Sequence, residues 1–573
     1  MEIIKKEERN EAHPYIPELK ELYRGGKISR REFLRNATLL GMSVASASTF
    51  LAGCAQPTPA PTEEPPAEAP EEEEEEAPSG GPQRGGTLRV ASQIQKVTHP
   101  AQFSWIMPTN IIRQVAEYLT VTDGNNITHP YLLESWEASD DLETWTLNLR
   151  QGIMHNNGDE FNADDVVFSL GQWLDEDVGS SIIGLMGYLS PDGIEKVDDY
   201  TVRLNLNRAE IAVPEHLFHY PAVILNHRTF EGDFIKAPHG TGPYTLEDYS
   251  EGEHASVKAR NDYWQIGADG QPLPYLDGME FIDMGEELSA WIAAIQAGEV
   301  DYLDLGDSNP VEAYQALKDN PDINVQPVTT AQTRVLRMRV DMDPWSDENV
   351  RMALKLCQNH DKILNLAYFG EGIPGQDFHV APVHPEYCEM PTPEFNPEKA
   401  KQLLADAGYP DGLDVELAVG SGWPDIVSYA EVLKEDAAAG GFNITLNTMP
   451  NSQYWELWTE VALGITPWTH RPLGTMVLNL AYIADENGDP VAWNETRWVD
   501  DEFTELLFEA NGTLDVVARR EIFCDLEKIQ YDRGPIGIPF WRNVWFVSSN
   551  KVKDLPGHPT YYMLSNETWM EQA

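Results

Sequence analysis

The chain has 573 residues, of which 42% are hydrophobic and 16 are tryptophan, so it is long enough to bury two or three cores. Its formal net charge is −54, and a surface of that sign repels nucleic acid and argues against a nucleic-acid partner. We interpret the acidity as a solvated surface, with attraction of cationic ligands as the alternative. The longest apolar stretch, residues 37–52, is too short and too polar to span a bilayer, so no integral membrane segment is expected.

The first 54 residues have the order of an export signal: a basic region, then a weakly apolar region, then a processing site of small residues. SRREFLR, residues 29–35, contains Arg30 and Arg31 and resembles the twin-arginine signal, which directs folded proteins to a dedicated translocase. LAGC, residues 51–54, resembles a bacterial lipobox. Together they imply that residues 1–53 are a signal peptide and that Cys54 carries the lipid. A cytosolic amphipathic helix with chance motifs is the alternative.

Residues 55–83 consist almost entirely of Pro, Glu, Ala, Thr and Gly, and residues 71–76 are six consecutive glutamates. Such a segment buries too little apolar surface to fold, so residues 54–84 are predicted to be a disordered, self-repelling tether. Two acyl chains on Cys54 would anchor it stably. The predicted location is therefore the outer face of the cytoplasmic membrane, in the periplasmic or other extracytoplasmic space.

The body begins with a turn at Gly85-Gly86 and a buried strand through Ala91. Alternation of apolar residues predicts a strand at 145–149 and another at 202–206. Between them, Asn162 can cap a helix whose first turn holds Asp164 and Asp165. His239 to Tyr244 forms a tight turn that enters a further strand.

Farther along, Asn396-Pro397 opens a helix with apolar residues at helical spacing that Gly408 can end. A strand at 415–419, a helix near 425–439 and a strand at 444–446 follow. Helices that alternate with strands in this way predict an α/β fold around a largely parallel sheet.

Several blocks of the body resemble the family 5 solute-binding proteins of ABC importers, the oligopeptide and dipeptide binders. They run in family order from residue 85 to about 550 and include GGTLRVA, TWTLNLRQGIMHNNGDEFNADDVVFS, GTGPY with RNDYW, IQAGEVDYL, VRMALKLCQNHDKI, NPEKAKQLLADAGYPDG and DEFTELLFEA. The resemblance implies a two-lobed periplasmic-binding-protein fold (type II, class C) with an additional third domain, which closes on its ligand like a hinged clamp.

The family layout implies lobe I at 85–120, 240–335 and 536–573, an extra domain II at 121–239, and lobe III at 336–535. The segments Arg334 to Val340, leading to Pro344, and Ile536 to Arg542 would then be the hinge crossings.

Beyond Cys54 the chain has three cysteines, Cys357, Cys388 and Cys524, without CxxC spacing. We expect buried free thiols, with a Cys357–Cys388 bridge as the alternative. A chain that folds before export should not need them for folding.

Two groups could in principle hold a metal ion. Glu215, His216 and His219 could share a helix face, but HxxH without a third ligand is weak. Asp485, Asn487 and Asp489 match the start of a calcium loop, but Pro490 replaces its glycine and Thr496 its final glutamate. No GxSxG, Walker or HExxH motif occurs. We therefore expect no metal, no cofactor and no enzymatic activity; a tethered secreted hydrolase is the rival interpretation.

Family peptide binders usually carry a Trp with an Asp three residues later, which pairs with the peptide's α-ammonium group. Here Trp468 is followed by His470 and Arg471, and a guanidinium repels an ammonium but suits a carboxylate. We hypothesise that Arg471 faces the cleft and binds an anionic group, with Trp468 and Trp493 or Tyr482 as stacking surface. An intralobe salt bridge of Arg471 is one alternative, and Asp485 as the ammonium partner is another.

The predicted function is capture of a peptide or peptide-like solute by a monomer that delivers it to the transmembrane subunits of an ABC permease. The alternative ligand is an anionic non-peptide solute, such as a carboxylate, an opine or an oligosaccharide. A ligand-sensing subunit of a receptor is a third possibility.

Overall fold

The computed structural model describes residues 16–24, 27–28, 33, 37, 81–104, 106–306, 310–484 and 488–572. Arg30, Arg31 and Cys54 lie outside the described residues, as do Asp485, Asn487 and all of the predicted tether before residue 81. Among the helices of the described part, none combines the length and the apolar character that crossing a membrane requires.

The largest sheet has twelve strands in the described residues. Its order is β15 (Phe442–Met449), β14 (Leu413–Gly420), β16 (Leu463–Trp468), β12 (Ile323–Met338), β18 (Phe540–Ser549), β11 (Tyr302–Leu303), β1 (Thr87–Ser92), β10 (Gly278–Asp283), β9 (His254–Ala259) and β8 (Tyr244–Ser250). Off this path, β13 (Gly372–Pro374) pairs with β18, and β17 (Ile536–Gly537) pairs with β12.

The expectation of a largely parallel sheet is wrong. β1 runs parallel to β10 and β11, and β14 runs parallel to β15 and β16. The centre is antiparallel, because β12 pairs antiparallel with both β16 and β18. The β8–β9–β10 edge is antiparallel as well.

Smaller sheets complete the strands. They are β2 (Thr120–Thr122) with β3 (Thr128–Pro130); β4 (Leu133–Ala138), β5 (Thr144–Leu149), β7 (Thr201–Asn205) and β6 (Ile194–Asp198) in that order; and β19 (Val552–Lys553) with β20 (Trp569–Met570).

The α-helices of the described part lie before and between these strands. They are α1 (Ile16–Arg24), α4 (Ile106–Ile112), α5 (Ala163–Leu174), α6 (Val213–His216), α7 (Leu288–Ala297), α8 (Pro310–Leu317), α9 (Glu348–Lys355), α10 (His360–Tyr368), α11 (Pro397–Asp406), α12 (Pro424–Ala439), α13 (Asn451–Leu457), α14 (Gly474–Ala481), α15 (Asp501–Asn511) and α16 (Val516–Arg533).

Local sequence signals mark several of these elements. The Asn162 side chain and Asp165 form a capping box at the start of α5, and Asn396 accepts a hydrogen bond from Lys399 N–H at the start of α11. The predicted strand at 145–149 is β5, with Trp145 and its alternate neighbours buried. The predicted strand at 202–206 is β7, which ends one residue earlier, at Asn205.

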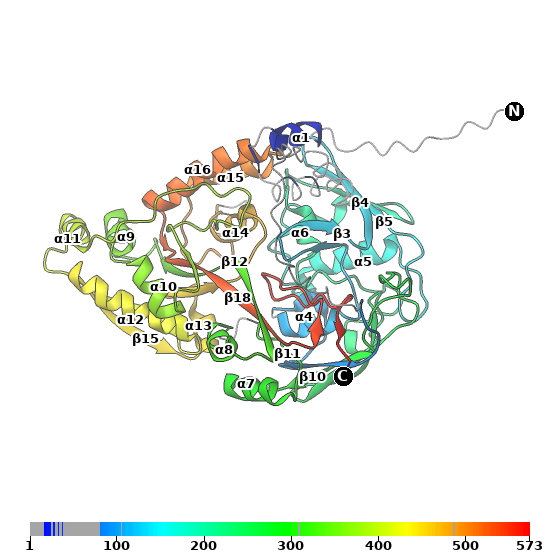
Figure 1. Ribbon diagram of the computed structural model, residues 1–573. Coiled ribbons are helices and arrows are strands. Elements are labelled where there is room, and N and C mark those ends of the chain that lie inside the picture. Colours follow the sequence, from blue (N-terminus) through cyan, green and yellow to red (C-terminus); the bar gives the residue numbers. More distant parts are fainter. Residues whose placement is uncertain are drawn as a thin grey trace, which may run out of the picture.

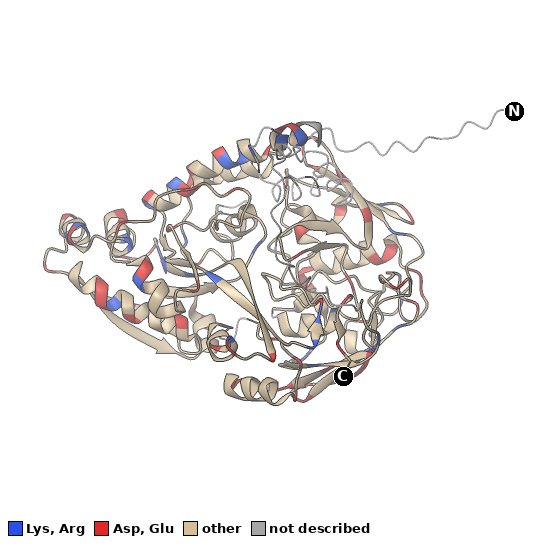
Figure 2. Ribbon diagram, viewed as in Figure 1, with Lys and Arg blue, Asp and Glu red and all other residues tan. Residues whose placement is uncertain are grey.

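The molecule has two lobes, which we name by their residues (Figure 1). The N-terminal lobe comprises the described residues of 81–306 and 550–572, and the C-terminal lobe comprises 339–535 without 485–487. One large core gathers apolar side chains of 88–302 with the end of the chain, and two others gather those of 311–545. β12 and β18 contribute side chains to the cores of both lobes. The predicted hinge crossing at 334–340 overlaps β12, and the one at 536–542 overlaps β17 and β18. Asp and Glu are distributed over both lobes, as a solvated acidic surface requires (Figure 2).

A small core joins α1 to the C-terminal lobe. Leu19, Ile28, Phe33 and Ala37 are buried with Val516 at the start of α16. The described part of the leader therefore lies against the folded body (Figure 1).

The cysteine prediction is correct for one residue and wrong for two. Cys357 is a buried free thiol, and burial raises its pKa to about 12. Cys388 forms a disulfide with Cys524 on α16, across a Cα–Cα distance of 5.1 Å, so the Cys357–Cys388 alternative is also wrong. The two partners are 136 residues apart, and only the tertiary fold brings them together.

Candidate ligand-binding cleft

A cavity of about 1060 Å³ lies between the two lobes. The N-terminal lobe lines it with residues near 184–187 and 207–210 and with His216 of α6, and the C-terminal lobe lines it with α14, α15 and the loop between them. Ala484 and Gly488, which flank the undescribed residues 485–487, line it too.

Trp468 is the last residue of β16, and the buried carboxylate of Glu495 holds its indole ring. Its Nε1 donates to Glu495 Oε1 at 2.8 Å, while Thr466 Oγ1 donates to Glu495 Oε2 at 2.5 Å. Burial raises the pKa of Glu495, and the nearby guanidinium of Arg337 opposes that rise. The indole is only 4% exposed, so its polar atom is committed to the C-terminal lobe and its orientation is fixed.

Arg471 follows in the loop between β16 and α14. Its side chain is 4% exposed, and Nη1 donates to Thr469 Oγ1 at 2.7 Å and to the His470 carbonyl at 3.0 Å. Within the described part of the chain, its Nε has no hydrogen-bond partner and its guanidinium has no carboxylate partner. The alternative of an intralobe salt bridge therefore has no support in the described part of the chain.

The N-terminal lobe presents neutral groups to Arg471. Burial, and then the charge of Arg471, lowers the pKa of His216 to about 3 and that of His219 well below its ordinary value. The same charge acts against the burial that raises the pKa of Tyr220 and Tyr562. Arg471 does not line the cavity itself, but its charge acts on neutral imidazoles and phenols of the opposite lobe.

The two histidines also have unused nitrogen atoms. His216 Nδ1 lies 2.9 Å from the Tyr188 hydroxyl, but His216 Nε2 and both nitrogens of His219 lack partners among the described residues. Glu215 faces elsewhere, because its Oε1 accepts from Thr128 Oγ1 at 2.9 Å. The described residues contain no group of three or more His, Cys, Asp or Glu that could hold a metal ion.

The remaining predicted ligand residues differ in what they can offer a solute. His470 points away from Arg471 and bonds Ala331 N–H and Asn126. Tyr482 is buried, with its hydroxyl 2.8 Å from His379 Nδ1. Trp493 is 37% exposed and lies edge-on to Trp468, with ring centroids 6.0 Å apart. Trp493 is therefore the accessible stacking surface of the set.

Sequence reasoning considered His216 and His219 only as metal ligands and did not connect Tyr220 or Tyr562 with the cleft. The available signal was two histidines inside the apolar segment IAVPEHLFHYPAVIL, residues 211–225. Polar groups in such a run are buried, and buried imidazoles require partners.

Comparison with known proteins identifies the family. Residues 128–479, more than half of the chain, match the model of the bacterial extracellular solute-binding proteins, family 5 Middle. The di/tripeptide-binding protein 1 of Pseudomonas aeruginosa is 26% identical over 461 residues, which cover 72% of this chain and 80% of that protein. Heme-binding protein A of Haemophilus influenzae is 26% identical over 487 residues, with coverages of 77% and 83%.

Solved structures show the same fold. AgaA from A. tumefaciens R10, in complex with agropinic acid, superposes with a TM-score of 0.73 at 21% identity and covers 85% of this chain and 99% of that one. AppA of Bacillus subtilis, in complex with a nonapeptide, gives 0.71 at 20% identity, with coverages of 86% and 100%. The fold is the expected two-lobed periplasmic-binding-protein fold with an additional domain, in a family of binding proteins rather than enzymes. This chain belongs to the bacterial extracellular solute-binding proteins of family 5.

Proposed function

We propose that the chain captures a peptide or peptide-like solute through an anionic group and delivers it to the transmembrane subunits of an ABC permease. The observation that carries the proposal is Arg471, a buried guanidinium between the lobes without a carboxylate partner among the described residues. A buried charge is costly unless it is paired. A carboxylate of the solute would supply that pair, in the planar geometry that a guanidinium prefers.

The relatives include binders of both peptide and non-peptide solutes. The names of two relatives specify dipeptides or tripeptides, and the AgaA complex contains agropinic acid. A non-peptide carboxylate is therefore the second candidate ligand, and Arg471 would bind it in the same way.

Closure of the lobes would assemble the site. The proposal uses the predicted division into lobe I (85–120, 240–335 and 536–573), domain II (121–239) and lobe III (336–535). β12 and β18 pass between the cores and would carry the hinge. Because Arg471 and the histidines His216 and His219 come from different lobes, a bound solute would stabilise the closed state through contacts that the open state lacks.

The location is also a proposal. Export by the twin-arginine route through Arg30 and Arg31, and a lipid on Cys54, would hold a monomer at the outer face of the cytoplasmic membrane. The extended Pro- and Glu-rich tether would let the folded body move away from the membrane surface and contact its permease.

Calorimetric titration tests the role of Arg471. Solute that copurifies with the natively expressed chain is first identified by mass spectrometry, and a peptide of that class is compared with its N-acetylated and C-amidated forms. We expect N-acetylation to leave binding intact and C-amidation to weaken it by about tenfold or more, since a hydrogen bond to a charged group contributes about 1.5–3 kcal/mol.

Two variants complete the test. Arg471→Met should show no difference between the acid and its amide, whereas Arg497→Met, a charge loss on the same lobe at a side chain that pairs with Glu460, should behave as the parent chain. Binding that is lost on N-acetylation and kept in Arg471→Met would refute the role of Arg471 and favour Asp485.

A further inference from the structure

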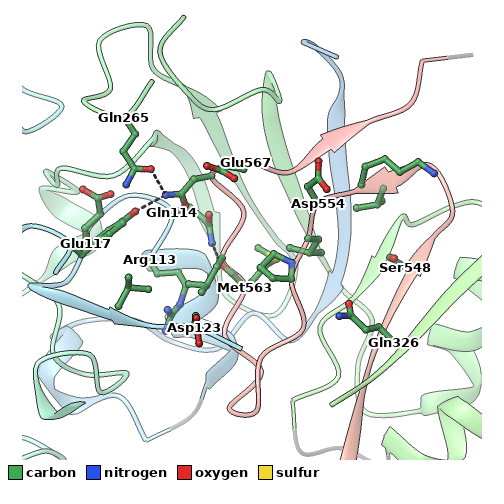
Figure 3. A pocket seen from close by; sticks show the side chains of 18 of the residues that line it. Arg113, Gln114, Glu117, Asp123, Gln265, Gln326, Ser548, Asp554, Met563 and Glu567 are labelled. Carbon is green, nitrogen blue, oxygen red and sulfur yellow. Dashed lines mark hydrogen bonds between the residues drawn. The ribbon is translucent and has the colours of Figure 1, made fainter. Parts of the chain in front are cut away.

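A second and larger cavity, of about 1230 Å³, lies apart from the cleft. Its walls come from residues 113–131, from Phe218 and Gln265, from the first part of β12, and from residues 548–567 (Figure 3). None of the residues that line it belongs to 339–535. A ligand here would contact the N-terminal lobe and its connecting strands without touching the C-terminal lobe.

Arg113, one residue after α4, is the buried cation of this cavity. The side chain is 6% exposed, and its guanidinium carbon lies 4.0 Å from the ring centroid of Tyr562, 5.0 Å from that of Tyr118 and 5.6 Å from that of Phe218. Aromatic faces stabilise the charge but satisfy none of its N–H groups. Nε, Nη1 and Nη2 all lack a hydrogen-bond partner among the described residues.

The carboxylates nearby are already engaged by other donors. Asp304 accepts from Asn110 Nδ2 at 3.0 Å and from Ser92 Oγ at 3.1 Å, and burial raises its pKa to about 7. Glu117 accepts from Tyr263 and Trp264, and burial raises its pKa as well.

Asp123 is committed in the same way. It accepts from Ile127 N–H and Asn125 N–H and lies 3.1 Å from His129 Nε2. The aromatic rings therefore form a cage around Arg113, but none of the described carboxylates pairs with it.

The rest of the cavity is polar. Figure 3 shows Gln114, Gln265 and Glu567 on the side of Arg113, with Gln326, Ser548 and Asp554 on the opposite side. Amides and hydroxyls suit a ligand with several hydroxyl or amide groups. The acidic side chains Asp123, Asp554 and Glu567 in the walls disfavour a dianion through like-charge repulsion.

We propose that this cavity is a second ligand site, which takes a small monocarboxylate bearing hydroxyl groups and pairs its carboxylate with Arg113. The planar carboxylate would accept two N–H groups from the edge of the guanidinium that the aromatic rings leave open. The two cavities share no lining residue, although Tyr562, which stacks on Arg113, also experiences the charge of Arg471.

The test uses the full chain and three probes observed by saturation-transfer NMR and calorimetry. Gluconate carries the carboxylate and hydroxyls, glucitol has a neutral hydroxymethyl group in place of the carboxylate, and glucose 6-phosphate carries a dianion. We expect gluconate to bind about tenfold or more tightly than either other probe, the size of one hydrogen-bonded charge contact.

Three variants locate the binding. Arg113→Met should abolish the preference for gluconate over glucitol. Lys258→Met, the loss of an exposed cation of the same lobe that does not line the cavity, and Arg471→Met, a loss in the C-terminal lobe, should both keep it. Arg113→Lys keeps the positive charge but loses the planar pair of N–H donors, so it should bind gluconate with intermediate affinity. This variant replaces Arg113→Met if that chain fails to fold.

Each contrary result overturns the proposal. Absence of gluconate binding would mean that only solvent fills the cavity. Equal binding of glucitol, or gluconate binding that survives in Arg113→Met, would show that Arg113 does not select the ligand. Loss in Arg471→Met alone would place the probe in the cleft.

Discussion

His470 Nε2 lies 2.8 Å from Asn126 Oδ1. The other ring nitrogen, Nδ1, accepts from the Ala331 N–H at 2.9 Å, so the proton is on Nε2 and the imidazole donates to Asn126. His470 belongs to the loop after β16 in the C-terminal lobe, and Asn126 belongs to the β2–β3 turn of the N-terminal lobe. The bond can therefore form only when the two lobes are together.

The first prediction concerns this contact. Asn126→Gly removes the acceptor and tolerates the backbone φ of 59° at that position. A neutral hydrogen bond contributes about 1 kcal/mol, so affinity for the solute should fall by about fivefold while the fold is retained. Calorimetry measures the affinity, and small-angle scattering with saturating solute measures the closed fraction.

Asn125→Gly, in the exposed neighbour within the same turn, is the control and should bind as the parent chain. If Asn126→Gly bound and closed normally, the His470 contact would have no part in closure.

The second prediction concerns pH. Burial raises the pKa of Asp304 from 3.8 to about 7, so the folded state binds this proton more tightly than the unfolded state does. The stabilisation is complete below pH 3.8 and is lost as the pH rises through about 7. Asp304→Asn keeps the shape of the side chain and an acceptor for Asn110 but does not titrate. The parent's free energy of unfolding should therefore fall relative to that of the variant as the pH rises through this window.

Urea unfolding at a series of pH values measures the difference between the two chains. Asp301→Asn, in a carboxylate that pairs instead with Arg89, is the comparison and should not show the same gain. A constant difference between parent and Asp304→Asn across the window would show that Asp304 has no raised pKa.

The third prediction concerns the Cys388–Cys524 disulfide. It closes a segment of 136 residues and fastens the chain before α11 to α16. Disulfides typically contribute about 2–4 kcal/mol of stabilisation, so Cys388→Ser with Cys524→Ser should lower the free energy of unfolding by about that amount in urea. If the chain is exported folded by the proposed twin-arginine route, folding precedes oxidation, and the variant should fold and bind solute.

Reduction of the parent chain should reproduce the same loss of stability, and reduction of the double variant should change nothing further. A double variant that fails to fold would contradict the expectation that the cysteines are dispensable for folding.

The features that sequence could predict are local ones. The cap at Asn162 and the helix start at Asn396 depend on neighbours within four residues, and the alternation through Trp145 reflects one strand with one buried face. Cys524 could not be paired by such reasoning, because its partner lies 136 residues away. The antiparallel centre of the sheet likewise depends on β12 meeting β18, which begins about 200 residues later in the chain.

The candidate site could likewise be predicted only in part from the sequence. The motif spacing singled out Arg471, and the structure finds it buried without an ion pair in the described residues. Its neighbour His470 points toward Ala331 and Asn126 instead, a consequence of backbone direction that a sequence window does not contain. The cage around Arg113 draws on Tyr118, Phe218 and Tyr562, which only tertiary packing assembles.

The fourth prediction concerns the export signal, whose key residues lie outside the described part of the chain. Arg30→Lys with Arg31→Lys keeps the positive charge of the leader but removes the paired guanidinium groups, so unprocessed precursor should accumulate in the cytoplasm. Arg35→Lys, five residues along the same basic region, is the matched control and should be exported. Cell fractionation with detection of precursor and mature forms measures the outcome.

Cys54→Ser separates anchoring from export: it should leave the twin-arginine step intact and prevent incorporation of labelled fatty acid. Normal processing of the lysine pair would refute the twin-arginine assignment, whereas labelling of Cys54→Ser would refute the assignment of Cys54 as the lipid-bearing residue.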